Sequence, residues 1–196
     1  MSKLVPKFYD LIMAPIENKR FKRIRSDMLV HAAGHVLEIG SGTGVNFPLY
    51  KDATTVTAVE PDETMKERSM EKVINSKVPI EVRLAYAENL PFVEDQFDCL
   101  VVTLALCTIQ DVNQALSEMR RVVKPGGQVM LFEHVRLNHS IVGKVQDVLT
   151  PFWKKVAGGC HLNREPLTLI KEAGFEVVEV EQMYKGLFLV IIAKNL

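Results

Sequence analysis

Short apolar runs rich in β-branched residues alternate with longer, helix-patterned segments from His35 onward. Strands that alternate with helices are joined by crossover connections, which place the strands in a largely parallel sheet. Five such runs predict strands at Val36–Ile39, Thr55–Val59, Ile80–Leu84, Phe97–Thr103 and Gln128–His134. The run FDCLVVT is almost entirely apolar after Asp98, as expected of a central strand covered on both faces. The sequence therefore predicts an α/β fold.

Helical patterns fill the intervals between these strands. They predict helices over Asn46–Lys51, Glu63–Asn75, Val112–Val123 and Arg164–Ala173. Asp62 is a candidate N-cap, and Pro125-Gly126-Gly127 predicts a sharp stop before the fifth strand. Near the end of the chain, FEVVEVEQ and LFLVIIAKN predict two further strands paired as an antiparallel edge, which makes a sheet of seven strands. Residues 1–30 predict an N-terminal helical cap or lid on a single domain of residues 1–196.

Length and composition limit the classes of protein that remain. A chain of 196 residues fits one domain, and 47% apolar with 24% charged residues is typical of a globular protein. Lysine plus arginine equals aspartate plus glutamate at 24 each, so we expect no nucleic-acid partner. The three cysteines show no metal-ligand spacing, so we expect neither a disulfide framework nor a metal site. Without a signal-peptide pattern or a run long enough to span a bilayer, a cytoplasmic location is the default expectation.

The segment VLEIGSGTGVNFPLY leads from a buried strand directly into three alternating glycines, Gly40, Gly42 and Gly44. Glycines allow positive φ and let backbone approach a ligand closely, and amides at such a turn suit an anionic or strongly polar ligand. A dinucleotide fold needs G-x-G-x-x-G, but Val45 stands where its third glycine would be. The pattern G-x-G-x-G after the acidic strand residue Glu38 fits S-adenosylmethionine (SAM) better than NAD.

One candidate for binding a ribose follows the second predicted strand. Glu60 ends TVTAVE, twenty residues beyond Gly40. A carboxylate at the carboxyl end of this strand can accept hydrogen bonds from both ribose hydroxyls. Combined with the glycine loop, this position makes the nucleotide-site prediction specific. The alternative to ribose binding is that Glu60 is simply a solvent-exposed glutamate at the end of a strand.

Together these motifs give the chain a family resemblance. The stretches VLEIGSGTG, TAVEPDETM, AENLPFVEDQFD, LVVTLALCTIQD and EMRRVVKPGGQVMLFEH resemble class I SAM-dependent methyltransferases. The similarity is strongest to the branch that holds ubiquinone/menaquinone-biosynthesis, phospholipid N-methyl and thiol-methylating enzymes. It runs from about Tyr9 to the C-terminus. The resemblance implies a Rossmann-like, seven-stranded, mostly parallel sheet with helices on both faces, and SAM as cofactor.

The resemblance also implies roles for particular residues. The methionine end of SAM would lie against Glu38 and the glycine loop, Ser41 included, and the ribose against Glu60. The adenine would lie among Pro61, Asp62, Tyr86, Ala87 and Glu88. One departure is that the family often reads Gly-Asp-Ala-Glu where this chain has Ala85-Tyr86-Ala87-Glu88. The usual adenine-binding aspartate is therefore missing, and Tyr86 would stack or hydrogen-bond in its place.

The acceptor side is less sharply marked in the sequence. Leu104, Leu106, Cys107 and Thr108 follow the fourth strand, where ligands gather at the carboxyl ends of an open α/β sheet. This places them near the transferred methyl group, with Leu104 as a cofactor-binding residue. His134 ends the fifth strand and is the best candidate for a general base, with Cys107 and His161 as the other catalytic candidates. Each has a structural alternative, since Cys107 is equally a small buried hydrophobe. The segment GGCHLNRE resembles a stretch of the phospholipid and thiol-methylating relatives and is placed over the acceptor pocket, unless it is an ordinary loop in which Asn163 caps a helix.

These observations favour a SAM-dependent methyltransferase acting on a small or lipophilic acceptor: a thiol, a quinone-like ring or a phospholipid amine. The main alternative is a protein that binds SAM without turnover. A nicotinamide oxidoreductase is disfavoured by Val45. The first 30 residues mix apolar with basic side chains, which predicts either a packed helix or a lid that makes peripheral contact with membranes. We expect a monomer or a homodimer.

Overall fold

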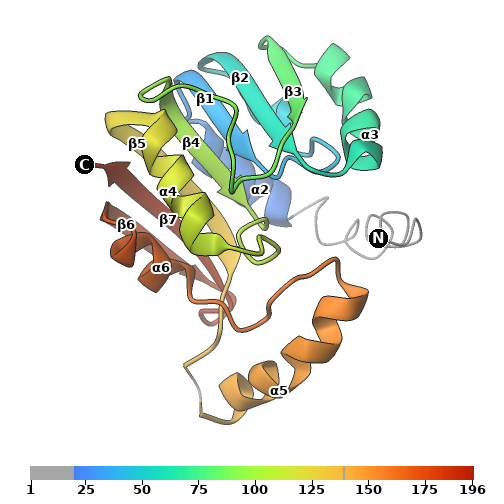
Figure 1. Ribbon diagram of the computed structural model, residues 1–196, viewed down its shortest axis with the longest axis vertical. Helices are drawn as coiled ribbons and strands as arrows, with labels where there is room; N and C mark the ends of the chain where they lie inside the picture. Colours follow the sequence, from blue (N-terminus) through green and yellow to red (C-terminus); the bar gives the residue numbers. More distant parts are fainter. Residues whose placement is uncertain (1–19, 139) are drawn as a thin grey trace.

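The protein folds around one seven-stranded sheet (Figure 1). The structure, a computed structural model, describes residues 20–138 and 140–196. Its elements are α2 (Lys22–Leu29), β1 (Gly34–Ile39), the 3-10 helix η2 (Phe47–Leu49), β2 (Ala53–Glu60), α3 (Glu63–Ile74), β3 (Ile80–Leu84), β4 (Phe97–Thr103), α4 (Val112–Val122), β5 (Val123–His134), α5 (Ser140–Val156), α6 (Pro166–Glu172), β6 (Phe175–Met183) and β7 (Phe188–Asn195). The strand order is β3-β2-β1-β4-β5-β7-β6. Strands β1 to β5 pair in parallel, whereas β7 pairs antiparallel with both β5 and β6. The predicted fold class is confirmed, including the antiparallel strands at the end of the chain.

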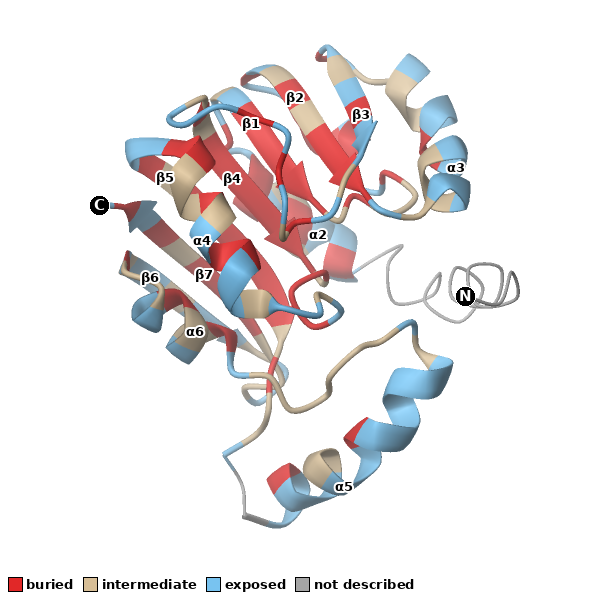
Figure 2. Ribbon diagram, viewed as in Figure 1, coloured by how far each residue is buried: buried red, intermediate tan, exposed pale blue. Residues whose placement is uncertain are grey.

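Helices cover both faces of the sheet (Figure 2). On one face, α4 packs a buried apolar stripe and α6 packs Ile170 into a core shared with β1, β4 and β5. On the other face, Leu29 of α2 and Phe21, the residue just before α2, belong to a second core with Phe47 of η2. The central strand β4 is buried along most of its length between these two cores, as its apolar sequence predicts. Of the predicted N-terminal cap, residues 20–30 lie in the described structure and residues 1–19 lie outside it.

Most predicted boundaries lie within two residues of the observed ones, and the main differences concern η2, β5 and α6. The predicted helix Asn46–Lys51 is wrong, because only the short η2 forms there; Pro48 lacks an amide proton and disfavours helical backbone in the residue before it. Strand β5 begins at Val123 instead of Gln128, with a register shift in its pairing to β4 that accommodates the Pro-Gly-Gly segment. Helix α6 begins at Pro166, and Asn163 does not cap it, since its side chain donates to Asp147.

Helix α5 was not expected from the sequence. It lies apart from the sheet, in the connection between β5 and α6 (Figure 1). Figure 2 shows most of its surface exposed, and among residues 141–156 only Gly143 and Thr150 are buried. A helix is usually predicted from an apolar stripe that packs on the core. The apolar residues of α5 do not pack on the core in this way. None of the helices in the described ranges is long and apolar enough to span a membrane.

Candidate active site

The parallel pairing brings the candidate residues to one edge of the sheet. Ile39 at the end of β1 pairs with Val59 in β2 and with Val102 in β4. Thr103 at the end of β4 pairs with Phe132 in β5. The loops that follow these four strands thus leave the sheet side by side, as in other open α/β sheets, whose ligands bind at this edge.

The glycine loop makes a left-handed turn directly after β1. Gly40, Gly42 and Gly44 have φ values of 66°, 54° and 71°, a region that favours glycine. A Cβ atom on Gly40 or Gly44 would lie 2.6 Å from Ala105 or Phe47, so close packing requires glycine there. A Cβ atom on Gly42 would meet nothing within 4 Å. Gly42 therefore borders open space, as a backbone that a ligand approaches should.

Glu60 joins this loop to the end of β2. Its Oε2 accepts a hydrogen bond from the Gly42 amide at 2.8 Å, and its Oε1 accepts one from the Asp62 amide at 3.0 Å. Burial raises the pKa of Glu60, against the effect of these two amides. Because each carboxylate oxygen has two lone pairs, acceptor capacity remains for hydroxyl donors. The structure brings Glu60 and the glycine loop together as the sequence predicts.

Glu38 is part of a buried polar network. Its Oε1 accepts from Asn46 Nδ2 at 3.0 Å and its Oε2 from Tyr50 OH at 2.7 Å. Asn46 also receives a hydrogen bond from Arg25 and donates one to Thr103. Both donors to Glu38 are therefore side chains rather than amides of the glycine loop. Burial raises the pKa of Glu38 to about 7, although both hydrogen bonds lower it. Sequence reasoning missed the other members of this network, which lie far apart along the chain.

The candidates for the adenine side differ in their surroundings. Asp62 caps α3, since its Oδ1 accepts from the Met65 amide at 3.1 Å, and Pro61 beside it is exposed. Ala87 is buried, and Glu88 Oε1 accepts from the amides of Gln110 and Asp111, just before α4. Tyr86 is 66% exposed, so its ring is free to meet a ligand.

Residues 104–106, the exit from β4, are held by hydrogen bonds to a side chain of β5. Leu104 has a φ of 53°, a conformation that costs a non-glycine residue free energy and is often found at functional sites. The buried Glu133 Oε1 accepts from the amides of Ala105 and Leu106 at 2.8 and 2.9 Å. Its Oε2 is buried and has no hydrogen-bond partner among the described residues. Burial raises the pKa of Glu133 to about 7. Sequence reasoning missed Glu133, which carries no motif of its own.

Cys107, His134 and Cys160 meet at this same edge. His134 Nε2 lies 3.2 Å from Cys160 Sγ, and the three ligand-type atoms all lie within 4.8 Å of one another. The hydrogen bond with Cys107 is the main cause that lowers the pKa of Cys160 to about 5, and it raises the pKa of Cys107. Burial lowers the pKa of His134, but the contact with Cys160 and the nearby Glu133 charge together raise it above its usual value. Two of the three catalytic candidates are thus neighbours.

The third candidate, His161, lies in the segment that holds this cluster in place. Its backbone amide donates to the Cys107 carbonyl at 2.9 Å, and its ring Nδ1 contacts the same oxygen at 3.0 Å. Arg164 donates to the carbonyls of Leu106 and Ile109. The segment 158–165 is therefore fastened to the exit loop of β4, the side where the sequence predicts the acceptor pocket.

The residues present fit SAM. Ser41 Oγ is buried without a hydrogen-bond partner in the described residues, beside the open space at Gly42. Glu60 retains acceptor capacity for two hydroxyls, and the exposed Tyr86 ring offers a flat apolar surface. A glycine turn with open space beside a hydroxyl that lacks a partner, a ribose acceptor and an aromatic surface suit an adenosyl sulfonium with an amino-acid end.

Comparisons with known proteins point to the same class. A methyltransferase-domain family model matches residues 37–131. The thiol S-methyltransferase TMT1B of Rattus norvegicus is 36% identical over 74% of this chain and 62% of that protein. The TMT1B of Mus musculus is 33% identical over 89% of this chain and 78% of that protein. A phosphatidylethanolamine N-methyltransferase of Cereibacter sphaeroides is 30% identical over 78% of this chain and 75% of that protein.

A solved structure supports the fold. A SAM-dependent methyltransferase from Thermotoga maritima superposes with a TM-score of 0.69, at 24% identity, over all of both chains. The fold and site define a class I SAM-dependent methyltransferase, with SAM as the methyl donor. Within that class the chain belongs to the family that includes the thiol S-methyltransferases and the phospholipid N-methyltransferases.

A substitution at Gly42 tests the place of the cofactor. Gly42→Val puts a branched side chain into the open space where SAM should bind, and we expect the affinity for S-adenosylhomocysteine, measured by calorimetry, to fall at least about tenfold. The positive φ adds a stability cost of about 1–2 kcal/mol or more. Gly126→Val is the matched control, because Gly126 also has positive φ and open space but lies outside the site. Equal affinity in folded Gly42→Val and Gly126→Val would contradict the placement.

The raised pKa of Glu38 predicts a pH dependence of stability. Between its ordinary value of 4.5 and its folded-state pKa of about 7, the folded protein binds more protons than the unfolded chain. The free energy of unfolding should therefore decrease as pH rises through this window. Glu38→Gln removes the titrating group, so urea denaturation at a series of pH values should show a weaker decrease in this variant. Parallel curves for the two proteins would contradict the assignment.

Proposed function

We propose that this protein transfers the methyl group of SAM to a lipophilic acceptor, with a thiol as the first candidate. The observation that carries the proposal is the convergence, at one edge of the sheet, of a loop that fits SAM and a largely apolar exit from β4. Leu104, Ala105 and Leu106 form that exit. The names of the relatives support a thiol or a lipid headgroup as acceptor. A quinone-like ring remains the third candidate.

Methyl transfer requires the protein mainly to align the donor with the acceptor. SAM supplies an electrophilic methyl group on a sulfonium, and in-line displacement needs a correctly held acceptor in a site that excludes water. Glu60 and the glycine loop would orient the donor, and Glu133 would hold the backbone of the β4 exit beside the acceptor. A thiolate acceptor needs no strong base, whereas a neutral hydroxyl does. The alternative, a protein that binds SAM without turnover, has the same cofactor residues but no acceptor specificity.

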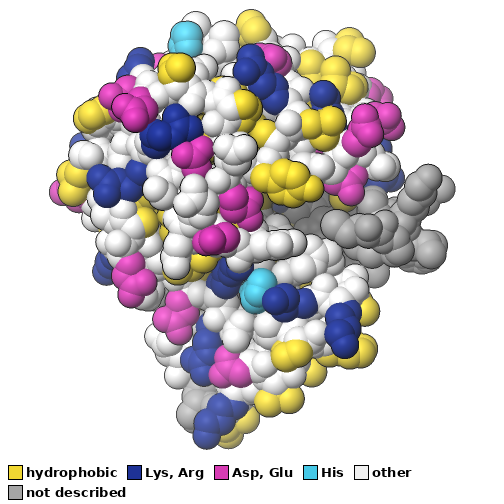
Figure 3. Space-filling view, in the orientation of Figure 1, with side chains coloured by type: hydrophobic (Ala, Val, Ile, Leu, Met, Phe, Trp, Pro, Cys, Tyr) yellow, Lys and Arg dark blue, Asp and Glu magenta, His cyan; other side chains and the backbone are white. Residues whose placement is uncertain are grey.

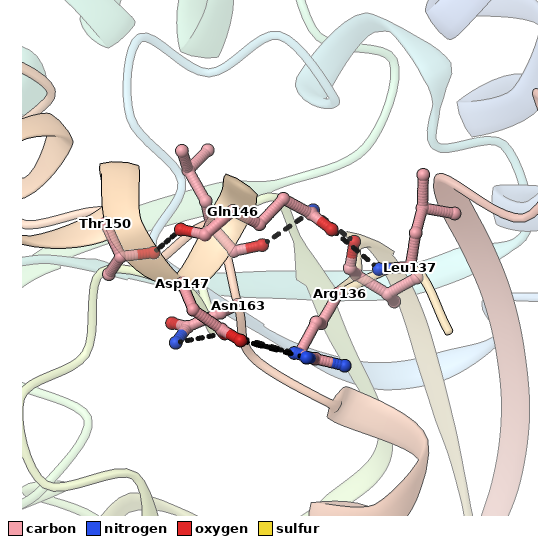
Figure 4. Close-up of polar contacts among 8 residues, drawn as sticks. Arg136, Leu137, Gln146, Asp147, Thr150 and Asn163 are labelled. Atoms are coloured by element: carbon pink, nitrogen blue, oxygen red, sulfur yellow. Dashed lines mark hydrogen bonds and ion pairs between the residues drawn. The ribbon is translucent and has the colours of Figure 1, made fainter. Parts of the chain in front are cut away.

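Helix α5 offers a route by which a lipophilic acceptor reaches this edge. Its polar side faces inward: Arg136 Nη2 and Asp147 Oδ2 form an ion pair at 2.9 Å, and Gln146 donates to the carbonyls of Val135 and Leu162 (Figure 4). The opposite side exposes large apolar side chains: Ile141, Val145, Val148, Leu149, Phe152 and Val156. Figure 3 shows apolar side chains (yellow) and basic side chains (dark blue) at the lower part of the molecule, where α5 lies in Figure 1.

An apolar surface with neighbouring lysines fits an anionic lipid surface. Lys144, Lys154 and Lys155 are exposed on α5, and Lys144 lines a shallow surface with Ile141, Val145, Val148 and Leu149. A helix of this kind lies in the plane of a membrane interface, with its apolar side chains among the lipids and its cations near anionic headgroups. Residues 1–19 of the predicted N-terminal lid lie outside the described structure, whereas α5 offers a described surface for membrane contact. The proposed location is therefore the cytoplasm, with peripheral contact to membranes.

Turnover is the direct test of the proposed function. Release of S-adenosylhomocysteine should be measured with an apolar thiol, a quinol and phosphatidylethanolamine, each at the same SAM concentration. The proposal predicts release above background with the thiol. Tight binding of SAM with no release for any acceptor would instead support the binding protein without turnover.

Glu60 should determine donor affinity. Glu60→Ala removes the charged acceptor of the ribose hydroxyls, so we expect SAM affinity to fall by about 1–3 kcal/mol, with Glu60→Gln retaining part of it. Glu81→Ala is the control, since Glu81 is an exposed carboxylate on neighbouring β3 that pairs with Arg83. If both Glu60 variants bind SAM as tightly as the Glu81 control, another residue holds the ribose.

Vesicle binding tests the role of α5. The double substitution Val148→Glu and Phe152→Glu places two carboxylates on its apolar side, and should strongly reduce sedimentation with phosphatidylserine-containing vesicles at low salt. Binding by the parent protein should weaken as salt rises. Val178→Glu is the control, because Val178 is an exposed apolar residue on β6. Unchanged sedimentation of the double variant would exclude α5 as the lipid contact.

A further inference from the structure

Three side chains far apart in the sequence converge beside the acceptor edge. Cys107 follows β4, His134 ends β5, and Cys160 lies between α5 and α6. Cys107 Sγ, Cys160 Sγ and one ring nitrogen of His134 lie within 4.8 Å of one another. The sequence showed no cysteine and histidine at metal-ligand spacing, because each ligand comes from a different element. The fold supplies the proximity that the spacing lacks.

We propose that Cys107, His134 and Cys160 form a three-ligand zinc site with a fourth coordination position open toward the acceptor. Two thiolates and an imidazole are ligands that zinc prefers, and three protein ligands with one open position are typical of catalytic zinc sites. From the usual metal-ligand distances, tetrahedral zinc needs about 3.6 Å between sulfur and nitrogen ligands and about 3.8 Å between two sulfurs. His134 Nε2 and Cys160 Sγ are 3.2 Å apart, close to that spacing.

The backbone around the ligands is fixed before any metal binds. The His161 amide donates to the Cys107 carbonyl at 2.9 Å, which fastens the Cys160 segment to the Cys107 loop. Arg164 donates to the carbonyls of Leu106 and Ile109 on either side of Cys107. Supporting contacts of this kind orient ligands and raise metal affinity. Only small side-chain movements are then needed to close the site.

The charges near the cluster suit a divalent cation. Glu133, adjacent to His134 in the chain, is buried and leaves its Oε2 without a hydrogen-bond partner in the described part of the protein. The guanidinium of Arg164 carries the opposite charge and balances this carboxylate. Two cysteine thiolates would then balance zinc. A buried carboxylate oxygen without a hydrogen bond is costly, so the positive charge of zinc would stabilise Glu133 further.

Bound zinc would activate a thiol acceptor, and this role rests on the proposed function. A thiol that takes the open position loses its proton to water, because zinc stabilises the thiolate. The thiolate sulfur then attacks the methyl carbon of SAM, the bond from that carbon to the sulfonium breaks, and its electron pair stays on the departing sulfur of S-adenosylhomocysteine. His134, as a ligand, is then no free base, and the reaction needs none.

Metal content tests the site without requiring turnover. The full chain, purified without chelators, should bind about one zinc per molecule, measured by mass spectrometry after offering equimolar zinc and dialysis. Cys160→Ser and His134→Asn should each weaken zinc affinity at least about tenfold in competition with a chromophoric chelator. Cys99→Ala is the matched control, since Cys99 is a free cysteine in β4 outside the cluster. Calorimetric binding of S-adenosylhomocysteine shows that each variant is folded.

Cobalt gives an independent readout. Cobalt-loaded parent protein should show a thiolate-to-metal charge-transfer band in the near ultraviolet, which Cys160→Ser should lose or greatly weaken. A parent protein that takes up no zinc, or a Cys160→Ser variant that binds it as tightly as the parent, would overturn the site. Unchanged thiol methylation after zinc removal would overturn the thiol-activating role. Zinc binding without methylation of any acceptor would refute the proposed function and leave the metal site standing.

Discussion

Parallel pairing of the four central strands is the constraint on which the rest of this structure depends. In a parallel sheet all strands run in one direction, so the carboxyl ends of β1, β2, β4 and β5 must share one edge. The glycine loop directly follows β1, and Leu104 directly follows β4. Glu60 is the last residue of β2, and His134 is the last residue of β5. A shift of one residue in any pairing would turn the side chains of that strand to the opposite face.

Two buried carboxylates make this edge rigid. Glu38 in β1 binds the side chains of Asn46 and Tyr50 and so fixes the turn after the glycine loop. Glu133 in β5 binds two amides after β4 and so fixes the opposite wall. Burying a carboxylate is unfavourable unless its hydrogen bonds are made, and for both residues desolvation raises the pKa to about 7. Two buried carboxylates with unfavourable desolvation thus lie beside the loops that we propose hold the ligand.

The meeting of the glycine loop with Glu60 was largely predictable because its signals are local. The strand before Gly40, the alternating glycines and Glu60 lie in one short stretch, and the structure joins Gly42 to Glu60 by a hydrogen bond. The short η2 was mispredicted as a helix, since Pro48 and the polar contacts of Asn46 and Tyr50 outweigh helical propensity.

The acceptor side was less predictable because it depends on contacts between distant residues. Cys107, His134 and Cys160 come from three separate parts of the chain, so their spacing in the sequence does not predict that they form a cluster. Helix α5 faces its polar residues inward and its apolar residues outward, the reverse of the pattern that predicts a helix packed on a core. Both features become visible only when the sheet is folded.

A crystal structure of the protein with bound S-adenosylhomocysteine tests the central claim most directly. The account predicts the ribose hydroxyls within hydrogen-bond distance of the Glu60 carboxylate, the amino-acid end over Gly42 and Ser41, and the sulfur directed toward the exit of β4. A ligand bound elsewhere, or a ribose held by residues other than Glu60, would contradict the account.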